Sequence, residues 1–103
     1  MMLHFLPRYV KDILSGRKVA TVRLGKKGVR PGMIVYLAVS GRPFAKARVV
    51  SVKVKKLKEL TTEEIRKEGS RSFLELVKEL RQIYPVISPE DEVTYIEWRI
   101  VEK

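Results

Sequence analysis

The chain is organised around one stretch, Ser15-Gly16-Arg17-Lys18-Val19-Ala20-Thr21-Val22-Arg23, which joins a predicted helix to a predicted strand. It brings an ammonium, a hydroxyl and a guanidinium group close together. Successive side chains in a strand alternate between faces, so Thr21 and Arg23 share one face and the apolar residues share the other. We expect the apolar face to join the core. The polar face then lines the mouth of a cleft, which Lys18 enters from the start of the strand.

The positive charge is concentrated in the first part of the sequence. The net charge is +10 and the pI is near 10.1. Residues 1–58 hold fifteen Lys and Arg against one acid, whereas residues 59–103 hold seven against eleven. Solubility or heat adaptation predicts mixed signs throughout, and a membrane surface would favour a basic amphipathic helix, which we do not find. The segregation is typical of a nucleic-acid-binding protein.

Composition excludes several classes of site. The 103 residues predict one domain, 1–103, and 45% hydrophobic content supports a modest core. The chain has no cysteine and a single histidine, His4, so we expect no metal and no cofactor. No apolar run reaches the roughly 20 residues of a membrane helix, and the N-terminus has no signal-peptide layout. We therefore expect a soluble, cytoplasmic protein that acts as a monomer and has no membrane partner.

The order of predicted elements indicates an α+β fold. Trp98 shares a strand face with two isoleucines and is expected in the core. The expected architecture is a small mixed β-barrel of about five to six strands with two or three helices packed on it, and an open α+β sheet is the alternative. The predicted strands are 2–5, 18–24, 33–39 (buried on both faces), 44–55 and 93–101, and the predicted helices are 7–15, 62–68 and a third that Ser70 or Ser72 caps and that ends near Tyr84.

Strand 44–55 changes phase near Val49 and Val50. A β-bulge there would restore one buried face, which continues through Val50, Val52 and Val54. The outer face then carries a basic stripe. The candidate RNA contacts are the stripe residues Lys46, Arg48, Lys53 and Lys55, together with Lys26 and Lys27 of the turn-rich loop 25–32 and Arg42 of the hairpin connection. For each residue alone, an ordinary solvent-exposed position is the alternative.

From Gly16 to Arg23 the sequence reads Gly-Arg-Lys-x-x-Thr-x-Arg. This string resembles the Gly-x-Lys-x-x-Glu-x-Arg hallmark of the ASCH domains, which belong to the PUA-like superfamily. Many members have glutamate at the position of Thr21. A branch of small ASCH proteins, the N4-acetylcytidine amidohydrolases, has threonine there, as this sequence does. Leu60-Thr61 followed by Glu68, and Ile83-Tyr84-Pro85 before the last strand, are similar to the layout of that branch. The resemblance implies a β-barrel whose cleft, beside the first helix, binds RNA or a modified nucleoside.

The resemblance also implies roles for individual residues. It implies that Thr21 is the nucleophile, Lys18 the base and Glu68 the acid/base, with Arg17 and Arg23 binding substrate. Amide hydrolysis needs an activated nucleophile, a proton carrier and stabilisation of the oxyanion, and these groups can supply them. Lys18 would act as a base if burial or the charge of Arg23 lowered its pKa.

Other interpretations of the same residues remain open. Lys18 and Glu68 can form an ion pair that only fixes a helix to the barrel, and Thr21 can be a strand residue chosen for β-propensity. Arg23 can form a buried bidentate pair instead of a ligand contact. Thr21 at the glutamate position favours an amidohydrolase that acts on acetylated cytidine, free or in RNA, whereas the basic first part of the chain favours RNA binding. A non-catalytic RNA-binding module is the alternative, and a ribonuclease is less favoured because the single histidine offers little acid–base chemistry.

Overall fold

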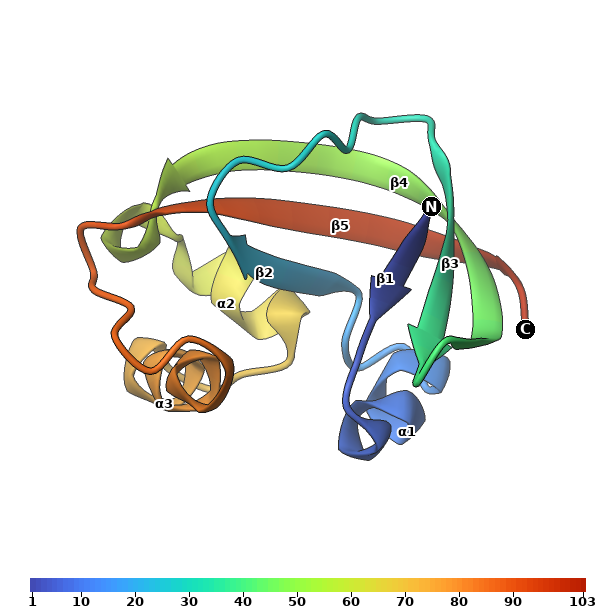
Figure 1. Ribbon diagram of the computed structural model, residues 1–103, viewed down its shortest axis with the longest axis horizontal. Coiled ribbons are helices and arrows are strands. Elements are labelled where there is room, and N and C mark those ends of the chain that lie inside the picture. Colours follow the sequence, from blue (N-terminus) through green and yellow to red (C-terminus); the bar gives the residue numbers. More distant parts are fainter.

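The computed structural model describes residues 1–103 and contains one mixed sheet. Its strands are β1 (Met2–His4), β2 (Ala20–Leu24), β3 (Ile34–Val39), β4 (Arg42–Lys56) and β5 (Glu92–Glu102), in the order β1-β3-β4-β5-β2. β1 runs parallel to β3, and the other neighbours are antiparallel. Figure 1 shows the sheet curled so that its two edge strands, β1 and β2, lie in front of the long strands β4 and β5. This curled half-barrel confirms the predicted α+β fold class.

The helices begin and end near the predicted residues. They are α1 (Val10–Leu14), α2 (Thr62–Glu68) and α3 (Phe73–Ile83), with 3-10 turns at Pro7–Tyr9 and Leu57–Glu59. The predicted capping box of α2 is present, since Thr61 Oγ1 accepts from the Glu64 amide at 3.1 Å and Glu64 Oε1 accepts from the Thr61 amide at 2.9 Å. Ser72 caps α3. None of these helices has the length and apolar character needed to cross a bilayer.

Two hydrophobic clusters lie on opposite faces of the sheet. On the outer face, Ala20, Val22 and Tyr95 pack with the apolar side chains of α2 and α3. Inside the curl, Trp98 and Leu37 belong to the second cluster, and the Trp98 ring meets the edge of the Phe5 ring at 5.6 Å between centroids. The prediction that Trp98 is a core residue is confirmed, because it is 3% exposed. The curled sheet therefore has a filled interior and one helix-covered outer region.

The predicted bulge in β4 is present, but only part of the face that was predicted to be buried is buried. The register shifts between Val49 and Ser51, which leaves Val50 as the extra residue. The prediction that Val50 and Val54 are buried is wrong, since they are 42% and 40% exposed. Val50 is the bulged residue itself, and Val54 is near the end of the strand, opposite Thr94.

β3 is buried on one face only, except at Ala38 near its end, which is fully buried. Val35 and Leu37 are fully buried, whereas Tyr36 is 41% exposed. The predicted burial of both faces is therefore wrong. The reason is that α2 and α3 pack over β2 and the first part of β5, and they leave the outer face of β3 uncovered.

Candidate functional site

A cavity of about 290 Å³ opens between the edge strands β1 and β2 and the end of α3. We call it the seam cavity. Three residues of the sequence-predicted site, Lys18, Thr21 and Arg23, line it together. The other lining residues are His4, Phe5, Leu6, Tyr9, Val22, Ile83 and Tyr84.

The Lys18 ammonium is buried and fully paired. Its Nζ donates to Ala20 O at 2.9 Å, to Glu68 O at 2.7 Å and to Glu68 Oε2 at 3.2 Å, which accounts for the three hydrogens of an ammonium group. The ring centroids of Phe5 and Tyr9 lie 5.9 and 5.3 Å from Nζ. Lys18 is 3% exposed, so its surroundings rather than water determine its charge state.

Local backbone geometry places Lys18 against α2. Gly16 adopts φ +84°, and the amides of Arg17 and Lys18 then both donate to Asp12 O, at 2.9 and 3.0 Å. At the other end, Gly69 adopts φ +103°, and a Cβ on this residue would lie 3.4 Å from Lys18 Cβ. The positive φ at the end of α2 requires glycine, and the turn that it makes lies directly against the lysine stem.

Glu68 lies behind Lys18 and does not line the seam cavity. Its Oε1 accepts a hydrogen bond of 2.9 Å from Ser70 Oγ, and its Oε2 faces Lys18. Burial lowers the pKa of Lys18 and raises the pKa of Glu68, while their mutual attraction opposes both shifts. Because burial penalises both charges, the neutral amine–carboxylic acid pair lies closer in energy to the ion pair than it does in water.

Arg23 connects Thr21 to the opposite edge strand. Its Nε donates to Thr21 Oγ1 at 3.0 Å, and its Nη2 donates to His4 O at 2.9 Å. The guanidinium carbon lies 5.0 Å from the centroid of the Phe5 ring. Thr21 thus accepts a charge-assisted hydrogen bond and keeps its own proton free to donate. A guanidinium in this position stabilises negative charge on the threonine oxygen.

Arg17 does not reach the seam cavity. Its side chain is 80% exposed and pairs with Asp12 at 3.8 Å. It lines a different, strongly polar hollow together with Arg66 and Arg71. Its predicted role in substrate binding therefore has no support from its position.

The predicted RNA contacts fall into three groups. Lys53 and Lys55 lie 3.1 and 3.0 Å from the buried carboxylate of Glu64, so both are engaged by a partner that local sequence did not indicate. Arg48 donates to Gly32 O at 3.3 Å. The remaining predicted contacts, Lys26, Lys27, Arg42 and Lys46, form none of the ion pairs in the structure.

Sequence reasoning missed the aromatic wall of the seam cavity. Phe5, Tyr9 and Tyr84 come from three different segments and meet only in the folded chain. The Tyr9 hydroxyl donates to Glu79 Oε2 at 3.2 Å, which ties the 3-10 turn to α3. Aromatic residues inside apolar patterns are usually core residues, so no local signal could have separated these three from the core.

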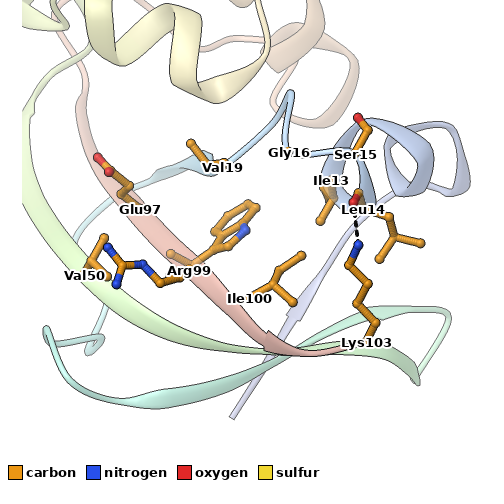
Figure 2. A pocket seen from close by; sticks show the side chains of 11 residues that line it. Ile13, Leu14, Ser15, Gly16, Val19, Val50, Glu97, Arg99, Ile100 and Lys103 are labelled. Atoms are coloured by element: carbon orange, nitrogen blue, oxygen red, sulfur yellow. Dashed lines mark hydrogen bonds between the residues drawn. The ribbon is translucent and has the colours of Figure 1, made fainter.

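A larger hollow of about 390 Å³ lies between α1 and β5. Figure 2 shows Lys103 reaching across it, where Nζ donates to Leu14 O at 3.1 Å. Ser15 is the one hydroxyl along it, and its Oγ donates to Asp12 O at 3.1 Å rather than to a base. No group of three or more His, Asp or Glu side chains is arranged to hold a metal ion anywhere in the chain. We therefore assign the candidate site to the seam cavity.

Comparison with known proteins agrees with the fold. The family model of the ASCH domain matches residues 4–102. The chain belongs to the ASCH domain family. The predicted resemblance is thus confirmed at the level of the family, and in this ASCH domain the hallmark residues Lys18 and Arg23 both line the seam cavity. Among curated proteins, none matches the chain.

Solved structures resemble this ASCH domain over most of its length. The hypothetical protein PH0355 is 26% identical, with a TM-score of 0.77 and coverage of 97% of both chains. The ASCH domain from Lactobacillus crispatus is 15% identical, with a TM-score of 0.77 over 90% of this chain and 70% of that one. The ASCH protein from Zymomonas mobilis is 13% identical, with a TM-score of 0.71 over 95% of this chain and 65% of that one. At such identities the last two establish the fold alone.

Proposed function

We propose that this ASCH domain hydrolyses the N4-acetyl amide of acetylated cytidine in the seam cavity. The observation that supports this most directly is that Lys18, Thr21 and Arg23 line one cavity, with Arg23 Nε 3.0 Å from Thr21 Oγ1 and Lys18 Nζ 3.2 Å from Glu68 Oε2. The cavity of about 290 Å³ is close to the lower limit for small-molecule sites, and its aromatic wall suits a single pyrimidine ring.

The first step is a proton transfer inside the buried pair. As an ammonium, Lys18 has no lone pair and cannot act as a base. Transfer of one proton from Nζ to Glu68 Oε2 gives a neutral amine and a carboxylic acid, and burial lowers the cost of this transfer because it penalises both charges. Glu68 thus acts through Lys18, as a positioning and proton-storing residue that does not touch the substrate.

The second step breaks the amide bond. Rotation about the Cε–Nζ bond turns the lone pair of the Lys18 amine from Glu68 toward Thr21. The amine then takes the hydroxyl proton of Thr21, and Oγ1 attacks the acetyl carbonyl carbon. Arg23 Nη1 donates to no protein group, so its hydrogens can bind the oxyanion that forms on the carbonyl oxygen. The C–N bond then breaks, and the Lys18 ammonium returns the proton to N4 of the leaving cytidine. The product on the protein is an acetyl ester of Thr21.

The last step restores the protein. The Lys18 amine takes a proton from a water molecule, which attacks the ester carbonyl. The C–O bond to Thr21 breaks, Oγ1 recovers a proton from Lys18, and acetate leaves. One water is consumed for each acetylcytidine converted to cytidine and acetate.

The test is incubation with N4-acetylcytidine, with cytidine and acetate measured by chromatography. Wild type should release both in equal amounts, and Thr21→Ala should lower kcat by about 10³-fold or more, because the nucleophile is lost. Thr21→Ser keeps the hydroxyl and should retain measurable turnover. A Thr21→Ala variant with the wild-type rate would eliminate the threonine ester and with it this mechanism.

A second candidate, binding of a nucleotide in RNA without hydrolysis, is favoured by the segregation of charge in the sequence. Residues 1–58 carry fifteen basic residues against one acid, and hydrolysis of a free nucleoside requires no such field. Under this alternative the seam cavity takes a base and releases it unchanged. Tight binding of N4-acetylcytidine without acetate release would favour it, and cleavage of the RNA chain itself would instead indicate a ribonuclease.

A further inference from the structure

The uncovered outer face of β3, β4 and β5 holds two arginines directly opposite each other. Arg48 on β4 pairs in register with Arg99 on β5, and both side chains are exposed. Neither takes part in any of the ion pairs in the structure. Like charges at directly opposed positions destabilise a sheet. This arrangement becomes favourable once an anion binds both guanidinium groups.

A tyrosine lies on the same face, beside the arginines. Tyr36 on β3 is directly opposite Lys46 on β4, two positions from Arg48 along that strand, and it is 41% exposed. Lys46 also lacks an acid partner within ion-pair distance, although Glu102 of β5 is in register with it. An exposed aromatic ring among unpaired cations combines a stacking surface with contacts for a chain of phosphates.

This face is separate from the seam cavity. Thr21 and Arg23 pair with Ile96 and Thr94 on the inner face of the sheet, whereas the two arginines point outward. The remaining outer face, near Tyr95, is covered by α2 and α3. We call the four residues Tyr36, Lys46, Arg48 and Arg99 the outer basic face. Exposed cations such as Lys26 and Arg42 also lack an acid partner, but the outer basic face combines an exposed aromatic ring with three cations that form no ion pair, of which Arg48 and Arg99 are exposed and Lys46 is half-buried.

We propose that the outer basic face binds single-stranded nucleic acid, with a base stacked on Tyr36 and consecutive phosphates held by Arg48, Arg99 and Lys46. Charge complementarity selects a polyanion, and the exposed ring selects one with unpaired bases. Binding at this face does not require hydrolysis in the cavity, so the two proposals can fail separately.

The test is fluorescence anisotropy with a labelled single-stranded RNA of about 12 nucleotides, titrated at several salt concentrations. Each phosphate contact contributes about −0.7 to the slope of log affinity against log salt, so Arg48→Ala and Arg99→Ala should each reduce the slope by about that amount. Tyr36→Ala should weaken binding about tenfold at an unchanged slope, while Tyr36→Phe keeps the ring and retains affinity.

Control measurements distinguish binding at the outer basic face from a general attraction of RNA to a positively charged protein. Lys58→Ala removes one exposed cation that is already paired with Glu90, at 2.6 Å, and should change affinity by less than about twofold. The same sequence as DNA shows whether the ribose matters, and circular dichroism confirms that each variant is folded. Loss of affinity in Lys58→Ala equal to that in Arg48→Ala would overturn the proposal.

Three further results would also contradict it: tighter binding of a duplex than of the single strand, equal competition by an acidic peptide, or salt slopes that none of the variants changes. The duplex result would exclude base stacking on Tyr36, and the peptide result would indicate an acidic protein as the partner. The RNA titration measures binding whether or not the protein hydrolyses its substrate, and the hydrolysis assay uses free N4-acetylcytidine without any oligonucleotide. A failed hydrolysis assay with mapped RNA binding therefore removes only the proposed function.

Discussion

Arg23 Nη2 donates a 2.9 Å hydrogen bond to the backbone oxygen of His4, across the opening between the edge strands β2 and β1. These strands are at opposite ends of the sheet order, so no ladder of backbone bonds joins them. The same guanidinium holds Thr21 Oγ1 through Nε. One side chain therefore both bridges the opening of the half-barrel and orients the proposed nucleophile.

We predict that Arg23→Lys lowers kcat/KM for N4-acetylcytidine by about 10²-fold. A lysine ammonium is a single point charge and cannot contact Thr21, His4 and the carbonyl oxygen in the fixed directions of a guanidinium. Chromatographic initial rates measure the effect. Arg30→Lys, at an exposed arginine outside the cavity, is the matched control and should keep the wild-type rate. Equal rates for Arg23→Lys and wild type would show that the guanidinium geometry is not needed.

We predict strong coupling between Lys18 and Glu68 in stability. Lys18→Met leaves a carboxylate buried without its partner and should lower the free energy of unfolding by about 3–5 kcal/mol. The double variant Lys18→Met/Glu68→Leu removes both charges and should recover much of that loss. Urea denaturation of the single and double variants measures the coupling. Additive losses would mean that the two groups do not stabilise each other.

The rate of hydrolysis should rise with pH. The neutral amine of Lys18 forms by proton transfer inside its pair with Glu68, so the base is lost when the pair takes up a second proton. Burial raises the pKa of Glu68 above its ordinary value of 4.5, so kcat/KM should fall on the acid side of an inflection that lies above 4.5. Thr21→Ser should keep the position of the inflection, because it leaves Lys18 and Glu68 in place. An inflection at or below 4.5 would argue against a buried, perturbed pair.

Stability in acid should depend on Glu64. Burial opposes the charge of this carboxylate, but the Thr61 amide and the ammonium groups of Lys55 and Lys53 outweigh burial and lower its pKa from 4.5 to about 2. A carboxylate whose pKa is lower in the folded state stabilises the fold at every pH above its pKa in the unfolded chain. This contribution, roughly 3 kcal/mol at most, is lost as the pH falls through about 2. Thermal unfolding of wild type and Glu64→Gln from neutral to acid pH measures it. Parallel curves would contradict the assignment.

Local patterns predicted the parts of the fold that depend on neighbouring residues. The alternation of residues 18–24 correctly separated Thr21 and Arg23 from the apolar residues of the strand, and the spacing of Thr61 and Glu64 identified a real capping box. The phase change at Val49 located the bulge in β4. Each of these features is decided within a few residues, by strand periodicity or by a helix end.

Features that depend on distant partners were not predictable in the same way. Lys55 and Lys53 form ion pairs with Glu64, which follows Lys55 by nine residues in the sequence. No local pattern in the basic stripe indicates these ion pairs. The exposure of Tyr36 follows from how far α2 and α3 extend over the sheet. The meeting of Lys18 and Glu68, 50 residues apart, was expected only from the family resemblance. Tertiary packing decides such contacts.

The edge contact between Phe5 and Trp98 supplies an intrinsic optical probe. Trp98 is the single tryptophan of the chain, and its ring centroid lies 5.6 Å from that of Phe5. Phe5 forms part of the wall of the seam cavity. A molecule entering that cavity displaces or stiffens Phe5 and so alters the environment of the indole. Ligand occupancy can therefore be followed by emission from the unmodified protein, with no dye attached and no turnover required.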